Sequence, residues 1–324
     1  MVASLKWIAE PLRIVQRHRW IGHFVLFPAS LGSALALASW WVTEPLTDQG
    51  GPVSSLSTTA PAAPRPTDPG AEAGAERNCP SPPSWPLTRL VGAPAKARLL
   101  EILLIAAERL GQVDSYTAKF HKQERIDGKL GPVQTLEMKV RQRPFAIYLK
   151  FLSPREGKEL VYAEGHHGNK LVAHDTGLSR LLVPRLALSP DHPLALADSR
   201  HAVTEAGLSN LTDRLLHFRR LDLDDLTAET ELDRFTDSEG RDWLRSIHTH
   251  PEFHAERPFA RVEVHYDPAT FIPVEILNYD WPAPGHVGEL LLAEHYAYEN
   301  VDLDAELTAI DFDPANPDYE FHRY

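Results

Sequence analysis

Apolar and polar residues alternate over much of the chain after residue 115, which is the pattern of β-strands. Tyr116, Ala118 and Phe120 are separated by polar residues, and side chains two positions apart in a strand lie on the same face. Similar alternation recurs over residues 133–142, 147–151, 260–266, 271–279 and 290–298. The pattern predicts roughly eight to ten antiparallel strands, each with one buried face.

Two segments have helical spacing instead. Over residues 95–111 apolar residues recur every three or four positions, and Gly111 is placed to end the helix. These apolar residues are Leu100, Leu103, Leu104, Ala107 and Leu110. A second helix is expected over residues 211–221, after a proline-interrupted segment, residues 175–209, that we expect to form a lid.

The order of these elements predicts an α+β domain over residues 95–324. Its expected centre is a strongly curved antiparallel sheet, a half-open β-barrel, with helices on the concave face.

The first 94 residues have a different character. Residues 1–20 are basic, and residues 24–42 carry no charge. As a helix, the span from Trp20 to Trp41 would measure roughly 31 Å, close to the thickness of a bilayer core. We expect a cytoplasmic segment at residues 1–20 and a signal anchor at residues 21–42, which would attach the chain to the inner membrane.

Small residues between Ala34 and Ala38 leave a cleaved signal peptide as the alternative, with release into the periplasm. In both cases the positive-inside rule places the folded part on the periplasmic side.

Residues 43–94 are rich in proline, alanine and glycine. Such a segment buries too little apolar area to offset its ordering entropy, so we expect a disordered linker. Its Cys79 is the only cysteine, which excludes an intramolecular disulfide. The formal net charge of -12 argues against binding to nucleic acid.

A histidine cluster is the strongest candidate for metal chemistry. His248 and His250 would face the same way in a strand, and a zinc site needs at least a third ligand. His254, Glu252 or His265 would supply it. The simpler interpretation is an exposed strand end whose histidines are only hydrophilic.

The acidic stretch of residues 311–318 lacks the glycine and glutamate positions of an EF-hand loop. We expect Asx turns there, with Phe312, Tyr319 and Phe321 packing inward.

Motifs of the common enzyme classes do not occur in the sequence. It has no Gly-x-Ser-x-Gly elbow, His-Glu-x-x-His helix, P-loop or dinucleotide fingerprint. A glycosidase-type carboxylate pair leaves no motif, and Glu263 or Glu275 could belong to one. We predict a protein that is not an enzyme and binds no cofactor.

Several short segments resemble a known family from about residue 90 to the C-terminus. They are Arg143-Pro144-Phe145 with Tyr148, Ser153-Pro154 with Glu156-Gly157, Tyr162 with Gly165, Glu205–Leu208, His250-Pro251, Tyr279–Pro282 and Asp311–Phe321. Together they resemble the bacterial domain of unknown function family 1571 (DUF1571), which is similar in fold to the LolA/LolB-like lipoprotein localisation factors. The resemblance implies the same curved-sheet architecture.

The predicted function is binding of a lipid, an acyl chain or a lipoprotein moiety in the half-barrel, without catalysis. Candidate lining residues are Tyr148, Phe151, Tyr162, Val262, Val264 and Ile276. Arg143 would contact an anionic head group or form a structural ion pair, and Trp281 would stand at the cavity mouth or fix a loop. The alternatives are an envelope scaffold with a filled core and a metal-dependent hydrolase using His248 and His250.

Overall fold

The strands form one sheet of 13 antiparallel strands in the described part of the chain. The computed structural model describes residues 84–176, 185–282 and 288–322. The strands are β1 Leu90–Val91, β2 Ser115–Ile126, β3 Lys129–Leu130, β4 Gln134–Arg141, β5 Ala146–Ser153, β6 Glu159–Ala163, β7 Leu171–His174, β8 Leu186–Leu188, β9 Glu229–Thr236, β10 Asp242–Thr249, β11 Arg261–Tyr266, β12 Pro273–Tyr279 and β13 Leu292–Asp302.

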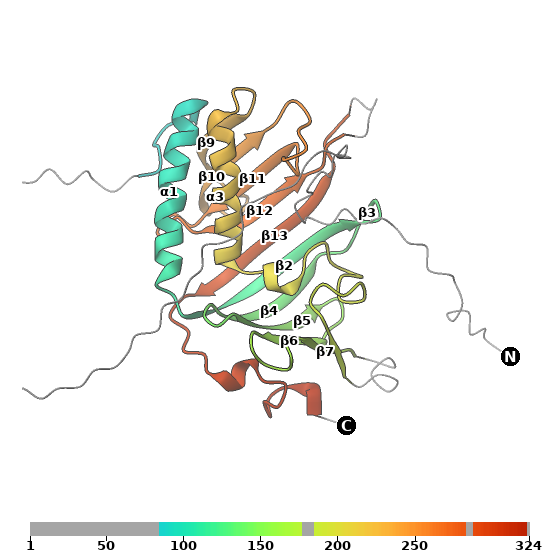
Figure 1. The fold of residues 1–324 in the computed structure, drawn as a ribbon. Helices are drawn as coiled ribbons and strands as arrows, with labels where there is room; N and C mark the ends of the chain where they lie inside the picture. The colour runs from blue at the N-terminus through green and yellow to red at the C-terminus, as the bar shows by residue number, and fades with distance from the viewer. Residues whose placement is uncertain (1–83, 177–184, 283–287, 323–324) are drawn as a thin grey trace, which may run out of the picture. The chain divides into compact units, whose positions relative to one another are not determined.

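The sheet is open and curved (Figure 1). Its order is β1-β9-β10-β11-β12-β13-β2-β4-β5-β6-β7-β8, with β3 beside β2. The predicted antiparallel α+β fold is therefore observed. More strands are present than predicted because β1, β3 and β8 are only two or three residues long, too short to show an alternating pattern.

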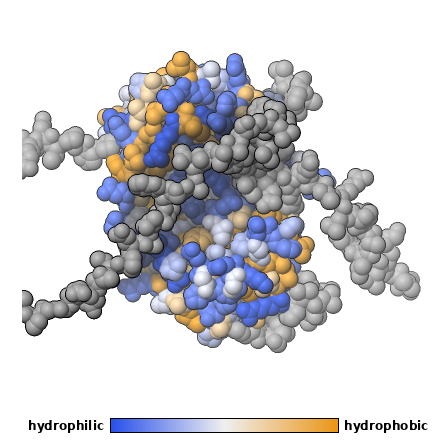
Figure 2. Space-filling view, viewed as in Figure 1, coloured by the Kyte–Doolittle hydropathy of each residue, from blue (hydrophilic) through white to orange (hydrophobic). Residues whose placement is uncertain are grey.

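Two helices, α1 Ala93–Gly111 and α3 Leu208–Asp224, lie side by side on one face of the sheet, called here the helical face (Figure 1). The buried side of α1 includes Leu99, Ile102, Leu103 and Ala106. Leu104 is 50% exposed. The sequence did not locate the centre of the buried side because apolar residues cover a wide arc of this helix. Small patches of hydrophobic residues remain exposed on the surface over the helices (Figure 2).

The N-terminus of α3 is fixed to the sheet by two tyrosine hydroxyls. The Leu208 amide donates to the Tyr116 hydroxyl at 2.9 Å, and the Gly207 amide donates to the Tyr298 hydroxyl at 3.3 Å. Gly207 has a φ of 106°, and a Cβ there would lie 3.0 Å from the Tyr116 hydroxyl oxygen. A glycine is therefore required at this approach of helix to strand.

The folded part begins earlier than predicted. Trp85 is buried, and its indole nitrogen donates to the Asp233 carbonyl at 2.8 Å. Leu90 and Val91 pair with β9. Residues 84–94 thus belong to the folded part, which corrects the end of the predicted linker. The linker as far as residue 83 and the predicted segments at residues 1–20 and 21–42 lie outside the described residues. No helix in the described part is long and apolar enough to cross a membrane.

The C-terminal tail packs on the other face of the sheet, called here the tail face. The tail contains two 3₁₀ helices, η2 Ala309–Phe312 and η3 Glu320–His322. A further 3₁₀ helix, η1 Val203–Glu205, lies outside the tail and precedes α3. Phe312, Tyr319 and Phe321 are buried, as predicted. Asp313 and Asn316 accept hydrogen bonds from the amides two residues further on, which confirms the Asx turns.

Candidate functional site

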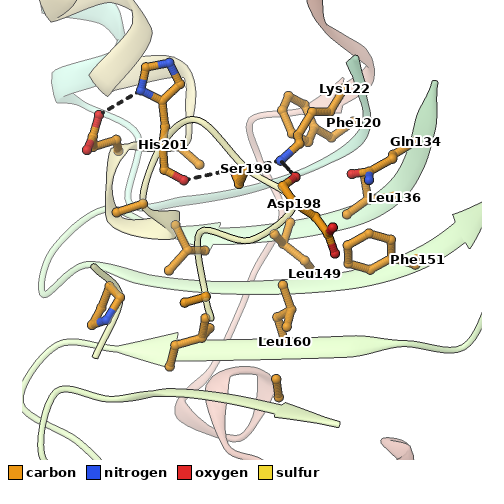
Figure 3. A pocket seen from close by; sticks show the side chains of 18 of the residues that line it. Phe120, Lys122, Gln134, Leu136, Leu149, Phe151, Leu160, Asp198, Ser199 and His201 are labelled. Carbon is orange, nitrogen blue, oxygen red and sulfur yellow. Dashed lines mark hydrogen bonds and ion pairs between the residues drawn. The ribbon is translucent and has the colours of Figure 1, made fainter. Parts of the chain in front are cut away.

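A cavity of about 630 Å³ lies on the helical face, over β2 and β4 to β7. Its floor consists of apolar side chains from neighbouring strands, since Leu136 of β4 pairs with Phe120 on one side and with Phe151 on the other. Leu149 and Leu160 extend the floor toward β6 (Figure 3). Strand alternation alone creates this floor, because each of these side chains lies on the same face of its strand.

Much of the remaining wall of the cavity comes from the segment between β7 and α3, with further residues from α3 and β13. We call residues 185–207 the cover segment. Its apolar cavity-lining residues are Leu186, Leu188, Pro190, Leu194, Ala195, Ala202, Val203 and Ala206. This segment belongs to the stretch that the sequence predicted to form a lid. The cavity is therefore lined by hydrocarbon from both the sheet and the cover segment.

Arg200 joins the cover segment to the far side of the cavity. Its Nε donates to Glu294 Oε1 at 2.7 Å, and its backbone amide donates to Glu124 Oε2 at 3.0 Å. Tyr296 also donates to Glu124, at 2.5 Å. The side chains of Glu124 and Glu294 are only 4% and 1% exposed. Both carboxylates are thus buried and depend on these donors.

Two further contacts hold the cover segment. Lys122 Nζ donates to the Ser199 hydroxyl at 2.8 Å (Figure 3). Arg155, in the loop after β5, forms a 2.8 Å ion pair with Asp198. Side chains of β2 and of the loop after β5 therefore hold the cover segment through polar contacts.

His201 connects two carboxylates at the inner end of the cover segment. Its Nε2 lies 2.8 Å from Glu294 Oε1, and its Nδ1 lies 3.2 Å from Glu205 Oε2. Burial lowers the pKa of His201, but the hydrogen bonds to Glu205 and Glu294 outweigh it and raise that pKa to about 9. Burial likewise opposes the change at Glu294, whose pKa is held at about 2 by the His201 contact. An imidazolium and a carboxylate therefore face each other near neutral pH.

Of the six predicted lining residues, Phe151 lies in the cavity floor. Tyr148 lies on the tail face, where its hydroxyl donates to Glu159 at 3.0 Å. Tyr162 is buried in the core on the helical face and contacts the Phe145 ring.

The other three predicted lining residues are Val262, Val264 and Ile276. They are buried in the core next to α1 and α3, away from the large cavity. Val262 and Ile276 border only a small cavity of about 30 Å³.

Arg143 and Trp281 make structural contacts. The Arg143 guanidinium donates to the Gly111 carbonyl at 2.8 Å, at the end of α1. The Trp281 indole donates to the Arg257 carbonyl at 3.1 Å and meets the Phe253 ring edge to face. Both residues fix loops to neighbouring elements, and neither lines the large cavity.

The candidate metal-binding histidines do not converge. His248 contacts the Thr230 hydroxyl at 3.2 Å and the Ser246 hydroxyl at 2.9 Å. His250 contacts the Phe259 carbonyl and Asp222, both at 3.1 Å.

The residues proposed as a third ligand are also placed elsewhere. His254 and Glu252 are exposed, and His265 lies between Glu263 and Glu275. In the described ranges, no group of three or more histidine, cysteine or acidic residues could hold a metal ion.

The two carboxylates considered as a glycosidase pair are unsuited to that role in this geometry. Glu263 and Glu275 lie 3.1 and 2.6 Å from the His265 ring. The His265 hydrogen bond lowers the pKa of Glu263, and at Glu275 the His265 and His295 contacts outweigh burial and lower the pKa to about 2. A glycosidase needs one carboxyl with a raised pKa as the acid.

Sequence reasoning missed the polar residues of the cavity. Lys122 and Glu124 follow Phe120 at two-residue steps in β2, so the alternation placed their charges on the same face as an apolar core. A charged residue on a buried strand face is an informative signal. Glu294 gives the same signal, since it precedes Tyr296 and Tyr298 at two-residue steps in β13. Arg200 and His201 have no comparable local signal, because they lie in an irregular segment.

A family model described as "Protein of unknown function (DUF1571)" matches residues 113–321. No curated protein matches the sequence. Among solved structures, the lipoprotein LppX of Mycobacterium tuberculosis is 13% identical, with 65% of this chain and 99% of that chain covered and a TM-score of 0.37.

Two other solved structures are similar to a comparable degree. A DUF1329 family protein from Desulfovibrio piger is 11% identical, with coverage of 68% and 97% and a TM-score of 0.33. A LolA superfamily protein from Nitrosomonas europaea is 11% identical, with coverage of 65% and 96% and a TM-score of 0.28. With identities and TM-scores this low, these similarities carry no conclusion about what this chain binds.

Proposed function

We propose that this chain, which belongs to the DUF1571 family, is a non-enzymatic binding protein that encloses the hydrocarbon part of a lipid or of a lipoprotein acyl chain. The observation that carries the proposal is the 630 Å³ cavity between the sheet and the cover segment. Ligand-binding pockets of about 300 to 1,000 Å³ bury most of the surface of a small molecule. The cavity is within that range.

The floor of the cavity favours hydrocarbon over a polar molecule. Phe120, Leu136, Leu149 and Phe151 supply adjacent apolar surface without an intervening polar side chain on that face. Burying a methylene group gains about 0.8 kcal/mol, so an acyl chain of ordinary length gains several kcal/mol from this floor. Opening of the cover segment would admit the chain, because the contacts of Arg155 and Lys122 with it are polar and can be replaced by water.

The polar groups of the cavity support binding more than catalysis. The Ser199 hydroxyl donates to the His201 carbonyl at 2.9 Å and accepts a hydrogen bond from Lys122. It does not contact an imidazole among the described residues, as the nucleophile of a serine hydrolase would. His201 is itself held between two carboxylates, which stabilises the charged ring and leaves it unsuited to act as a base.

The cavity also bears on the two alternatives. A scaffold with a filled core would not contain an apolar cavity of this size, because protein interiors are close-packed. The metal-dependent hydrolase requires His248 and His250 to share a metal, but their ring nitrogens contact protein atoms. The cavity thus supports binding of a hydrophobic ligand over the scaffold, and the histidine contacts count against the hydrolase.

The cellular location is part of the proposal and rests on the sequence. The basic residues before the uncharged run of residues 24–42 support attachment to the inner membrane with the folded part on the periplasmic side. Alkaline extraction of membranes tests it: the full chain should remain in the membrane fraction if the run is an anchor, and should be recovered shortened and soluble if the run is cleaved.

Mass spectrometry of an organic extract tests the binding function. The full chain, purified from membranes, should carry a lipid in a fixed ratio to protein. The variant Leu160→Trp fills the cavity from β6 and should lower the bound lipid at least tenfold. Leu104→Trp is the matched control, because Leu104 is 50% exposed on α1. Equal lipid in both variants, or wild-type protein that neither carries nor takes up lipid, would contradict the proposed function.

A further inference from the structure

Lys158 differs from the other cationic residues of the cavity wall. It immediately precedes β6 and is half-buried. Its Nζ lies 5.1 Å from the centroid of the Phe151 ring, which belongs to the cavity floor. The Phe151 amide also donates to the Lys158 carbonyl at 2.8 Å. The β5–β6 loop therefore fixes an ammonium group at the border between the apolar floor and the cavity mouth.

The other cations of the wall have carboxylate partners. The pairs are Lys122 with Glu124 at 3.2 Å, Arg155 with Asp198 at 2.8 Å, His174 with Glu159 at 3.0 Å, His201 with Glu294 at 2.8 Å and Arg214 with Glu205 at 2.8 Å. Lys158 forms no ion pair with any carboxylate of the described ranges; its neighbour is the Phe151 ring.

A half-buried ammonium group without an ion-pair partner is unfavourable. Burial lowers the pKa of Lys158, and the nearby Arg155 cation lowers it further. The carboxylates of Asp175 and Asp198 oppose this change without outweighing it. The aromatic face offsets only part of the lost hydration. An anion beside Lys158 would accept a charge-assisted hydrogen bond from its ammonium group. Such bonds are strong in partly desolvated surroundings.

From this arrangement we infer that the ligand is an amphiphile with an anionic head group, a carboxylate or a phosphate, which pairs with Lys158 while its hydrocarbon chain lies on the floor beside Phe151. This inference rests on the proposed function and adds the class of ligand. The head group lies at the mouth because Lys158 is partly exposed, and the chain extends toward Leu136 and Leu149.

Binding of three probes of equal chain length tests the inference: a long-chain fatty acid, the corresponding alkyl phosphate and the corresponding alcohol. The full chain, with bound lipid removed, should bind the two anions more tightly than the alcohol. Lys158→Gln should weaken binding of the preferred anion about tenfold or more, the usual effect of losing one charge-assisted hydrogen bond. Binding of the alcohol should stay unchanged. The comparison of fatty acid with alkyl phosphate identifies the preferred anion.

Lys150→Gln is the matched control. It removes the same charge from β5, but Lys150 lies on the opposite face of that strand from Phe151. Lys158→Arg should retain most of the binding. Equal binding of all three probes, or equal loss for anion and alcohol in Lys158→Gln, would overturn the anionic head group and leave the proposed function standing. Wild-type protein that binds none of the probes would overturn both.

Discussion

Tyr148 and Tyr319 stack with their ring centroids 4.0 Å apart and their planes 5° from parallel. Tyr148 belongs to β5, and Tyr319 belongs to the C-terminal tail. Lys139 lies over both rings and forms a 2.7 Å ion pair with Asp311 of the tail. The tail is therefore part of the core of this fold, and it covers the tail face behind the cavity floor.

Tyr319→Ala should destabilise the protein by about 3 kcal/mol, because it removes a buried aromatic ring and leaves a void against Tyr148. Urea unfolding followed by circular dichroism measures the change. Ile310→Ala, at a tail residue that is 46% exposed, should change the free energy of unfolding by less than about 1 kcal/mol. Equal effects of the two variants would show that the stacking does not hold the tail.

Glu294→Gln should lower the free energy of unfolding by about 3 kcal/mol. The carboxylate accepts hydrogen bonds from Arg200 and Asn278 and contacts His201. Its neutralisation removes the buried anion that Arg200 and His201 share. Glu299→Gln on the same strand is the control, since the Glu299 side chain is 44% exposed and should cost about 1 kcal/mol or less. Chemical unfolding at neutral pH measures the free energy of unfolding of both variants, and equal losses would contradict the role of Glu294.

His201 should make stability depend on pH above neutrality. Its pKa is raised from 6.5 to about 9 in the folded protein. A raised pKa means that the stabilisation is fully present below pH 6.5 and is lost as the pH rises through about 9. Arg200 and Arg214 also lie near this ring, and Glu205 and Glu294 contact it.

The loss should amount to at most about 3 kcal/mol. It is measured as the difference in unfolding free energy between wild type and His201→Gln across that range. His265, whose pKa is raised to about 8, should contribute a separate fall that both proteins share. A difference that does not change with pH would contradict the role of His201.

Asp222→Asn should destabilise the protein by about 3 to 5 kcal/mol. Asp222 is 1% exposed and lies 3.0 to 3.1 Å from nitrogens of Arg219, His250 and Arg257. Its neutralisation leaves buried guanidinium groups without an anion. Asp224→Asn, at an exposed position two residues on, should have little effect. Differential scanning calorimetry of the two variants checks this, and similar melting temperatures would contradict it.

Local patterns predicted the elements well where they were long and periodic. The Asp127-Gly128 pair is a hairpin signal, and a hairpin occurs there with positive φ angles at both residues. The helix expected over residues 95–111 is α1, which begins two residues earlier. The inward packing of the tail aromatics followed from turn chemistry between apolar residues.

The cavity was harder to predict, for two physical reasons. Tyr148 and Phe151 are three positions apart in one strand, so alternation places them on opposite faces of the sheet. Only one of the two could therefore line the cavity. Val262, Val264 and Ile276 are on the helical face, but the helices cover that part of it. Which part of a sheet a helix covers depends on packing between distant segments, and a single sequence does not contain that information.

The pairing of β13 with β2 makes this a fold that is completed late. Phe120 lies opposite Tyr298, so β2 leaves the ribosome long before the strand that covers its second edge. Until then that edge exposes unpaired backbone groups, which invite association with other chains. The wall formed by Tyr296 and Tyr298 is also missing, so the cavity first exists when synthesis is nearly finished. Folding should be slow and limited by this long-range step, and chains that end before β13 should aggregate without ever binding a ligand.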